Sequence, residues 1–399
     1  MPSFSPRRVA TSVFAVAFYV CLSILHRTLA TYGRLESRLF QLCARLLAVK
    51  PCGVYNPHEC AIVVIGADEG MLHKSLMLLV SVSINYGFAL ADIGKHVSFR
   101  FSELGYTVFT LCRQDRHGLH SDGSTSVSSL MYEWHKVRKK SGNTAWGLIA
   151  PISLDLGDTS QHAHVFETIH AYCGTHSLRL VNVIMLLPQT QFVQDSFASY
   201  VAHHANVSSQ RRDWNVIDTD TMKSWDDSFK WAVTEPVLVV QNCLDSLVAS
   251  SGRVVMISEC RDNVFLPSGS LSPLHGTHQS LSRYLSRELA PLGVHVSIVH
   301  AGESAALPSG SKVSSNNESG IQATIRMIQQ ILLFSSPLDT LRHFAVQPQE
   351  IIDLVQYIAT TPYPKRRYTI GIVPLISAVL EATPQILWLL GDALMGRMS

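Results

Sequence analysis

The sequence has few charged residues and almost no net charge. Charged side chains make up 16% of its 399 residues, and the formal net charge at pH 7 is +2. Proteins that bind nucleic acid through its phosphates carry a much stronger basic surface, so we expect no nucleic-acid partner. Hydrophobic residues make up 47% of the chain, which excludes a mainly disordered protein and allows a large core.

The chain also lacks the cysteine spacing of a metal or disulfide scaffold. Its eight cysteines are scattered, and no two of them form a Cys-x-x-Cys pair. Zinc ribbons need such pairs, and small secreted scaffolds need a denser cysteine framework. We therefore expect no metal site, and we expect reduced thiols in an intracellular setting.

Acidic residues are absent before Glu36, and residues 9–25 form a run of seventeen residues without a charge. A membrane-spanning helix needs roughly 20 apolar residues, with a lower limit near 17. A retained anchor, a mitochondrial targeting helix and an ordinary packing helix are all compatible with this run. We favour the anchor, at the endoplasmic reticulum or the mitochondrial outer membrane, with the folded domain facing the reducing cytosol.

Short apolar runs alternate with helical patterns along most of the chain. The clearest helical patterns cover residues 161–175 and 225–247, and Pro236 predicts a kink or a helix start within the second. The apolar runs, typical of buried parallel strands, cover residues 61–65, 106–111, 149–154, 179–187, 253–258 and 294–299. This alternation predicts an α/β fold of the Rossmann type, a doubly wound and mostly parallel sheet with helices on both faces.

We divide the chain into an N-terminal apolar helix with its linker (1–55), a Rossmann-like domain (56–335) and a C-terminal helical extension (336–399). Prolines and a glutamate within residues 372–390 argue against a membrane span there and favour surface helices. The distance from Met71 to Gly105 is thirty-four residues, about twice what one helix needs to cross a sheet. An insertion over about residues 79–98, or a helical hairpin, would account for the excess.

Ser258 ends the fifth strand run, and a helical pattern and another strand run follow it. This order resembles the second half of a short-chain dehydrogenase/reductase, and the resemblance spans about residues 59–371. In that family the catalytic serine, which orients the substrate carbonyl, is followed by a tyrosine thirteen residues later and a lysine four residues after that. Here those positions hold Leu271 and His275. The sequence looks closest to a divergent fungal branch of the family, a domain of unknown function.

The resemblance implies a catalytic centre at Ser258 without its proton donor. Leu271 cannot donate a proton, whereas His275 can titrate near neutral pH and hold a positive charge. His275 is therefore a candidate catalytic residue beside Ser258, although an ordinary helix histidine is the more common explanation.

The resemblance also implies a dinucleotide site, at which several residues depart from the family pattern. Gly66 and Gly70 match two of the three glycines of the phosphate loop, but Leu72 replaces the third. Asp68 and Glu69 add negative charge beside the expected phosphates. A plain turn between a strand and a helix would also explain the two glycines.

Three further positions concern the cofactor site. Arg113 follows the second strand run, where a basic residue suits the 2′-phosphate of NADP, although a solvated arginine is an alternative. Asp155 stands where the family contacts adenine, but it could instead cap the next helix. Pro188 replaces part of the family's Asn-Asn-Ala-Gly segment. We expect weak or absent dinucleotide binding, with NADPH preferred over NADH.

Two functions follow from these residues. The first is a degenerate reductase fold that acts as a binding or scaffold protein at a membrane. The alternative is an NADP-dependent oxidoreductase acting on a lipid-like substrate with a rearranged acid. A defective gene product is a third interpretation, and nothing in the sequence indicates the oligomeric state.

Overall fold

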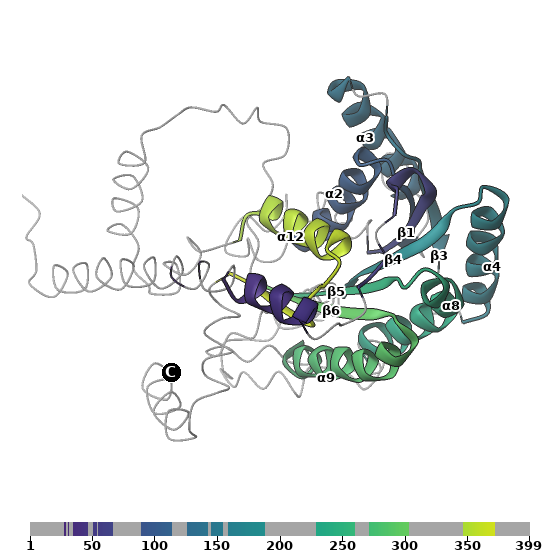
Figure 1. The fold of residues 1–399 in the computed structure, drawn as a ribbon. Coiled ribbons are helices and arrows are strands. Elements are labelled where there is room, and N and C mark those ends of the chain that lie inside the picture. Colours follow the sequence, from purple (N-terminus) through teal and green to yellow (C-terminus); the bar gives the residue numbers. More distant parts are fainter. Residues whose placement is uncertain are drawn as a thin grey trace, which may run out of the picture.

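The computed structural model describes twelve stretches of the chain: residues 28, 31, 35–46, 51–53, 55–66, 89–113, 126–142, 145–154, 159–187, 229–259, 271–302 and 346–371. These residues form one sheet with helices packed on both faces (Figure 1). Among them, no helix is long and apolar enough to cross a membrane. Residues 9–25 and 372–390 lie outside the described stretches.

The sheet has seven strands in the order β3-β2-β1-β4-β5-β6-β7, and every neighbouring pair is parallel. The strands are β1 (Cys60–Ile65), β2 (Thr107–Arg113), β3 (Ile149–Leu154), β4 (Arg179–Leu187), β5 (Arg253–Glu259), β6 (His295–Ala301) and β7 (Arg367–Ile370). The order runs outward in both directions from β1 and β4, which is the Rossmann arrangement. The predicted fold class is therefore confirmed.

Helices cover both faces of the sheet, because each long strand crossover must return across one of them. One face carries α2 (Ala89–Glu103), α3 (Ser126–Ser141) and α12 (Pro348–Thr360). The other carries α4 (Thr159–Thr175), α8 (Glu235–Ala249) and α9 (Leu271–Leu289). A short π-helix (Lys230–Thr234) leads into α8, so the helix starts beside Pro236 as the sequence predicts.

Two hydrophobic clusters fill the space between the sheet and its helices. All six residues of β1 are buried, as expected for a central strand with helices on both sides. Phe101 on α2 is 1% exposed and belongs to the first cluster, and Phe166 on α4 is 1% exposed and belongs to the second. The clusters therefore bury comparable aromatic side chains on opposite faces.

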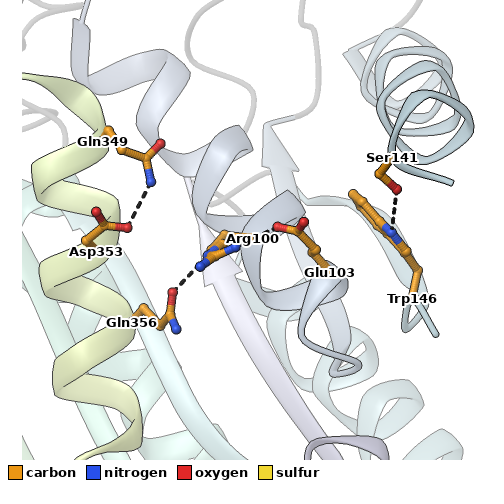
Figure 2. Close-up of polar contacts among 7 residues, drawn as sticks. All are labelled: Arg100, Glu103, Ser141, Trp146, Gln349, Asp353 and Gln356. Carbon is orange, nitrogen blue, oxygen red and sulfur yellow. Dashed lines mark hydrogen bonds and ion pairs between the residues drawn. The ribbon is translucent and has the colours of Figure 1, made fainter. Parts of the chain in front are cut away.

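Polar contacts join the helices of the first face at its rim. Figure 2 shows Arg100 of α2 donating from Nε to Oε1 of Gln356 of α12 at 2.8 Å. The same guanidinium pairs with Glu103 at 2.8 Å. The α2–α12 packing thus links residues that are 256 positions apart in sequence.

Two segments differ in detail from the sequence-based division. Residues 89–98 form the first part of α2, and Ile93 and Val97 there are fully buried. Residues 79–88 lie outside the described stretches, so the insertion stays a prediction. Within residues 336–399, β7 pairs with β6 and completes the sheet, which a purely helical extension does not include. The buried Tyr368 explains this, because its side chain packs into the first cluster.

Candidate functional site

The candidate site residues gather at the carboxyl edge of the sheet. Gly66 directly follows β1, Arg113 is the last residue of β2, and Ser258 is the second-last residue of β5. All strands run in the same direction, so these three positions share one edge. Open α/β sheets bind their ligands at this edge, where the strand order reverses, here between β1 and β4.

The cofactor residues are placed only in part. Gly66 has a φ of 85°, a left-handed conformation that favours glycine and lets the chain turn sharply after β1. Arg113 lies at the end of β2 opposite Leu154, the last residue of β3. Gly70 and Asp155 lie outside the described residues, as do Leu72 and Pro188.

Ser258 is fully buried and hydrogen-bonded to a histidine that the sequence analysis did not single out. Its Oγ lies 3.1 Å from Nδ1 of His278, a fully buried residue of α9. Because either ring nitrogen of a neutral histidine can carry the proton, the hydroxyl either donates to Nδ1 or accepts from it. In both cases the contact holds the serine hydroxyl against α9.

Leu271 and His275 both lie on α9, as their spacing predicts. Leu271 is the first residue of the helix and His275 lies one turn later. Their side chains are outside the part that the structure describes, so their roles remain predictions. His278 lies three positions after His275 on the same helix.

A second buried histidine lies next to Ser258 in the sheet. His300 of β6 is the register partner of Ser258 and is also fully buried. Parallel neighbours in register point to the same face, so His300 faces α9 as Ser258 does. The sequence did carry a signal for His278, because it precedes the buried Leu281 and Leu285 at helical spacings of three and seven. The sequence gives no comparable indication that His300 is buried beside Ser258, because His300 simply follows the apolar residues of β6.

Ser258, His278 and His300 therefore form a group of buried polar residues on the face of the sheet that α9 covers. In the described stretches, no group of three His, Cys, Asp or Glu side chains could hold a metal ion.

A cavity of about 540 Å³ lies between α4 and α8, on the same face as this cluster. In it, His170 of α4 bonds through Nε2 to the carbonyl oxygen of Asn242 at 2.8 Å. A carbonyl can only accept, so Nε2 donates to it, and Nδ1 lies 3.0 Å from the Ser246 hydroxyl. Burial raises the pKa of the neighbouring Cys173 thiol to about 11 and keeps it protonated.

A buried pair also joins α4 to the start of α8. Nε2 of His162 lies 3.1 Å from Oε2 of Glu235, with side chains 2% and 3% exposed. Glu235 is the first residue of α8, immediately after the π-helix. Removing one partner of such a buried pair lowers stability strongly, because water cannot replace the lost contact.

No known protein-family model matches the chain, and no curated protein matches it. Several of the solved structures that resemble it are short-chain dehydrogenases/reductases. A metagenomic short-chain oxidoreductase in complex with NADP is 15% identical, with a TM-score of 0.45 over 79% of this chain and 97% of that one. A short-chain dehydrogenase from Streptomyces avermitilis is 17% identical, with a TM-score of 0.47 over 82% and 94%. An alcohol dehydrogenase from the archaeon Thermococcus sibiricus, complexed with 5-hydroxy-NADP, is 12% identical, with a TM-score of 0.47 over 78% and 96%.

Proposed function

We propose that this chain is a Rossmann-fold binding protein without reductase activity, held at a membrane through residues 9–25. The observation that carries the proposal is the contact between Ser258 and His278, both fully buried. This contact engages the hydroxyl that the resemblance assigns to orienting the substrate carbonyl. Leu271 at the tyrosine position supplies no proton to replace it.

The ligand of this binding protein would occupy the carboxyl edge of the sheet. Gly66 allows a tight turn there, and Arg113 offers a position for a 2′-phosphate. Asp68 and Glu69 oppose phosphates by like charge, so binding of NADPH would be weak and that of NADH weaker.

Calorimetric titration with NADPH and NADH, together with a hydride-transfer assay, tests this proposal. We expect NADPH to bind more tightly than NADH, and Arg113→Glu to remove that difference. No change in NADPH absorbance at 340 nm should follow addition of aldehydes, ketones or quinones. Turnover that Ser258→Ala abolishes would instead establish the alternative, an NADP-dependent oxidoreductase acting on a lipid-like substrate.

The membrane part of the proposal is tested separately. Carbonate extraction of membranes should leave the full chain in the pellet and release a variant that lacks residues 9–25. Equal release of both proteins would show that this segment is not an anchor.

A further inference from the structure

The helix over residues 35–46 rests on the folded domain by one side only. Ala44 on that side is 5% exposed. Gln41 donates from Nε2 to the Tyr357 hydroxyl at 2.6 Å and to Oγ1 of Thr361 at 3.2 Å. Glu36 pairs with Lys365 at 3.0 Å. In Figure 1 this helix is drawn in purple below α12.

The opposite side of the same helix carries a stripe of exposed leucines. Their exposed fractions are 55%, 52%, 53% and 75% for Leu35, Leu39, Leu42 and Leu46. With 3.6 residues per turn, these four residues fall within an arc of about 60°, centred about 170° from Ala44. We call them the leucine stripe. A helix normally turns its apolar side toward the core, so this arrangement indicates a second apolar environment.

The charges around the leucine stripe are positive. Arg38 and Arg45 are exposed and flank it on one side of the helix. The first fifty residues contain seven arginines and lysines but only one acid, Glu36, which is paired with Lys365. Apolar side chains flanked by arginines match an anionic bilayer surface, where the leucines enter the acyl boundary and the arginines contact phosphates.

A second copy of the chain fits this surface less well. Twelve residues of helix extend for about 18 Å, so two such stripes would bury only a few hundred Å². Specific protein interfaces bury roughly 1,200 Å² or more. Pairing would also bring the arginines of the two copies together without an acid to balance them.

We propose that the helix over residues 35–46 lies in the plane of an anionic membrane surface with the leucine stripe in the lipid. Its contacts with the domain go to Tyr357, Thr361 and Lys365, at the end of α12 and in the turn before β7. That turn lies at the amino edge of the sheet, as the bond from Arg253 at the start of β5 to the Thr361 carbonyl confirms. The carboxyl edge, with Ser258, therefore lies at the far end of the strands from the docked helix.

An orientation with the amino edge toward the membrane restricts the kind of ligand that can reach the proposed binding site. A site at the edge opposite to the membrane takes its ligand from water and not directly from the bilayer. The inference about the ligand rests on the proposed function, whereas the docking of the helix does not.

The exposed Cys43 gives a probe position on this helix, about 70° from the centre of the leucine stripe. The full chain with Cys21→Ser and Cys260→Ser is labelled at Cys43 with a polarity-sensitive fluorophore. It is mixed with vesicles of phosphatidylcholine alone or with phosphatidylserine, each with brominated acyl chains as quenchers. We expect quenching and a blue shift in the anionic vesicles, and much smaller changes in the neutral ones.

Leu39→Glu with Leu42→Glu should abolish the quenching. The matched control is Leu148→Glu with Leu292→Glu, two leucines of 41% and 46% exposure on other elements, and it should keep the quenching. An unquenched probe on vesicle-bound wild-type chain would overturn the inference, as would equal quenching in the stripe variant. A probe already shielded without vesicles would also overturn it, because the stripe would then be covered by protein.

The measurements separate this inference from the proposed function. Carbonate extraction reports the anchor at residues 9–25, and NADPH titration reports the binding site. The signal from Cys43 reports only the helix over residues 35–46.

Discussion

The two faces of the sheet bury similar apolar cores but use different polar groups. Under α2, α3 and α12, a serine hydroxyl accepts from the buried Trp134 indole, and the contact between Arg100 and Gln356 lies at the half-buried rim (Figure 2). Under α4, α8 and α9, histidines lie against polar partners inside the packing: His162 lies 3.1 Å from Glu235, and His278 is hydrogen-bonded to Ser258. A rim contact can be exchanged for water, whereas an internal one cannot. The buried histidine contacts of the second face should therefore matter more for stability than the rim contact of the first.

We expect the largest effects on the free energy of unfolding from substitutions in the two apolar cores. Phe101→Ala and Phe166→Ala should each lower the free energy of unfolding by about 3–5 kcal/mol, because each removes a fully buried ring on one face. Urea unfolding followed by circular dichroism measures both. A large difference between the two values would show that the faces are not equivalent even in their apolar packing.

Matched acids on the two faces test the polar difference directly. Glu235→Ala should cost about 3 kcal/mol, because it leaves His162 buried without its carboxylate. Glu103→Ala on α2 should cost less than about 1 kcal/mol, because its pairing with Arg100 is open to water. Equal costs in urea unfolding would contradict the comparison.

The pH dependence of stability tests the first face at its amino edge. The pKa of His295 is lowered by burial, and next by the positive charges of Arg253 and Arg366. The unfolded state, with an imidazole pKa near ~6.5, therefore binds more protons than the folded state below that pH. The stability from neutral His295 is complete above about pH 6.5 and is lost as the pH falls toward the lower folded pKa.

His295→Gln should accordingly lose less stability than the wild type between neutral pH and pH 5.5. Thermal unfolding at a series of pH values measures this difference. His58→Gln, in the short 3-10 helix just before β1, is a control for the loss of an imidazole. A variant that follows the wild-type pH curve would rule out His295 as the cause.

The smallest effects that we expect are differences in the reaction rates of the cysteine thiols. Burial raises the pKa of Cys60, in the first cluster, and of Cys173, in the second, to about 11. Both stay protonated at pH 8, whereas the exposed Cys43 should react with iodoacetamide first. If the rates at Cys60 and Cys173 rise together with urea, the two faces open together. Earlier reaction of one thiol would identify the face that opens first.

Much of the fold was predictable because buried parallel strands leave continuous apolar runs. The strand predictions at residues 149–154 and 179–187 match the observed bounds of β3 and β4. The short edge strand β7 was not predicted, since its four residues include Arg367 and Thr369 and form no apolar run. The helix over residues 35–46 was not predicted either, because it lies in the segment assigned to the linker after the longer apolar run.

The candidate site was less predictable than the fold. The sequence placed Ser258 at a strand end, where the structure has it. It did not reveal the contact with His278, because periodicity shows which residues face the core but not which of them bond to each other. The deviations at Leu271 and His275 could be read from spacing alone, whereas the contact of His278 with Ser258 depends on the three-dimensional packing of α9 on β5.

The contact between Gln41 and Tyr357 has a consequence for the order of events during synthesis. The two residues are 316 positions apart, so their contact cannot form until nearly the whole chain has been made. At about 5–20 residues per second, the helix over residues 35–46 waits on the order of 15–60 s for its partners on α12. During that interval both of its sides are free, and it can reach a nearby membrane before the domain closes on it. The nascent chain would then fold already oriented, with its amino edge toward the lipid.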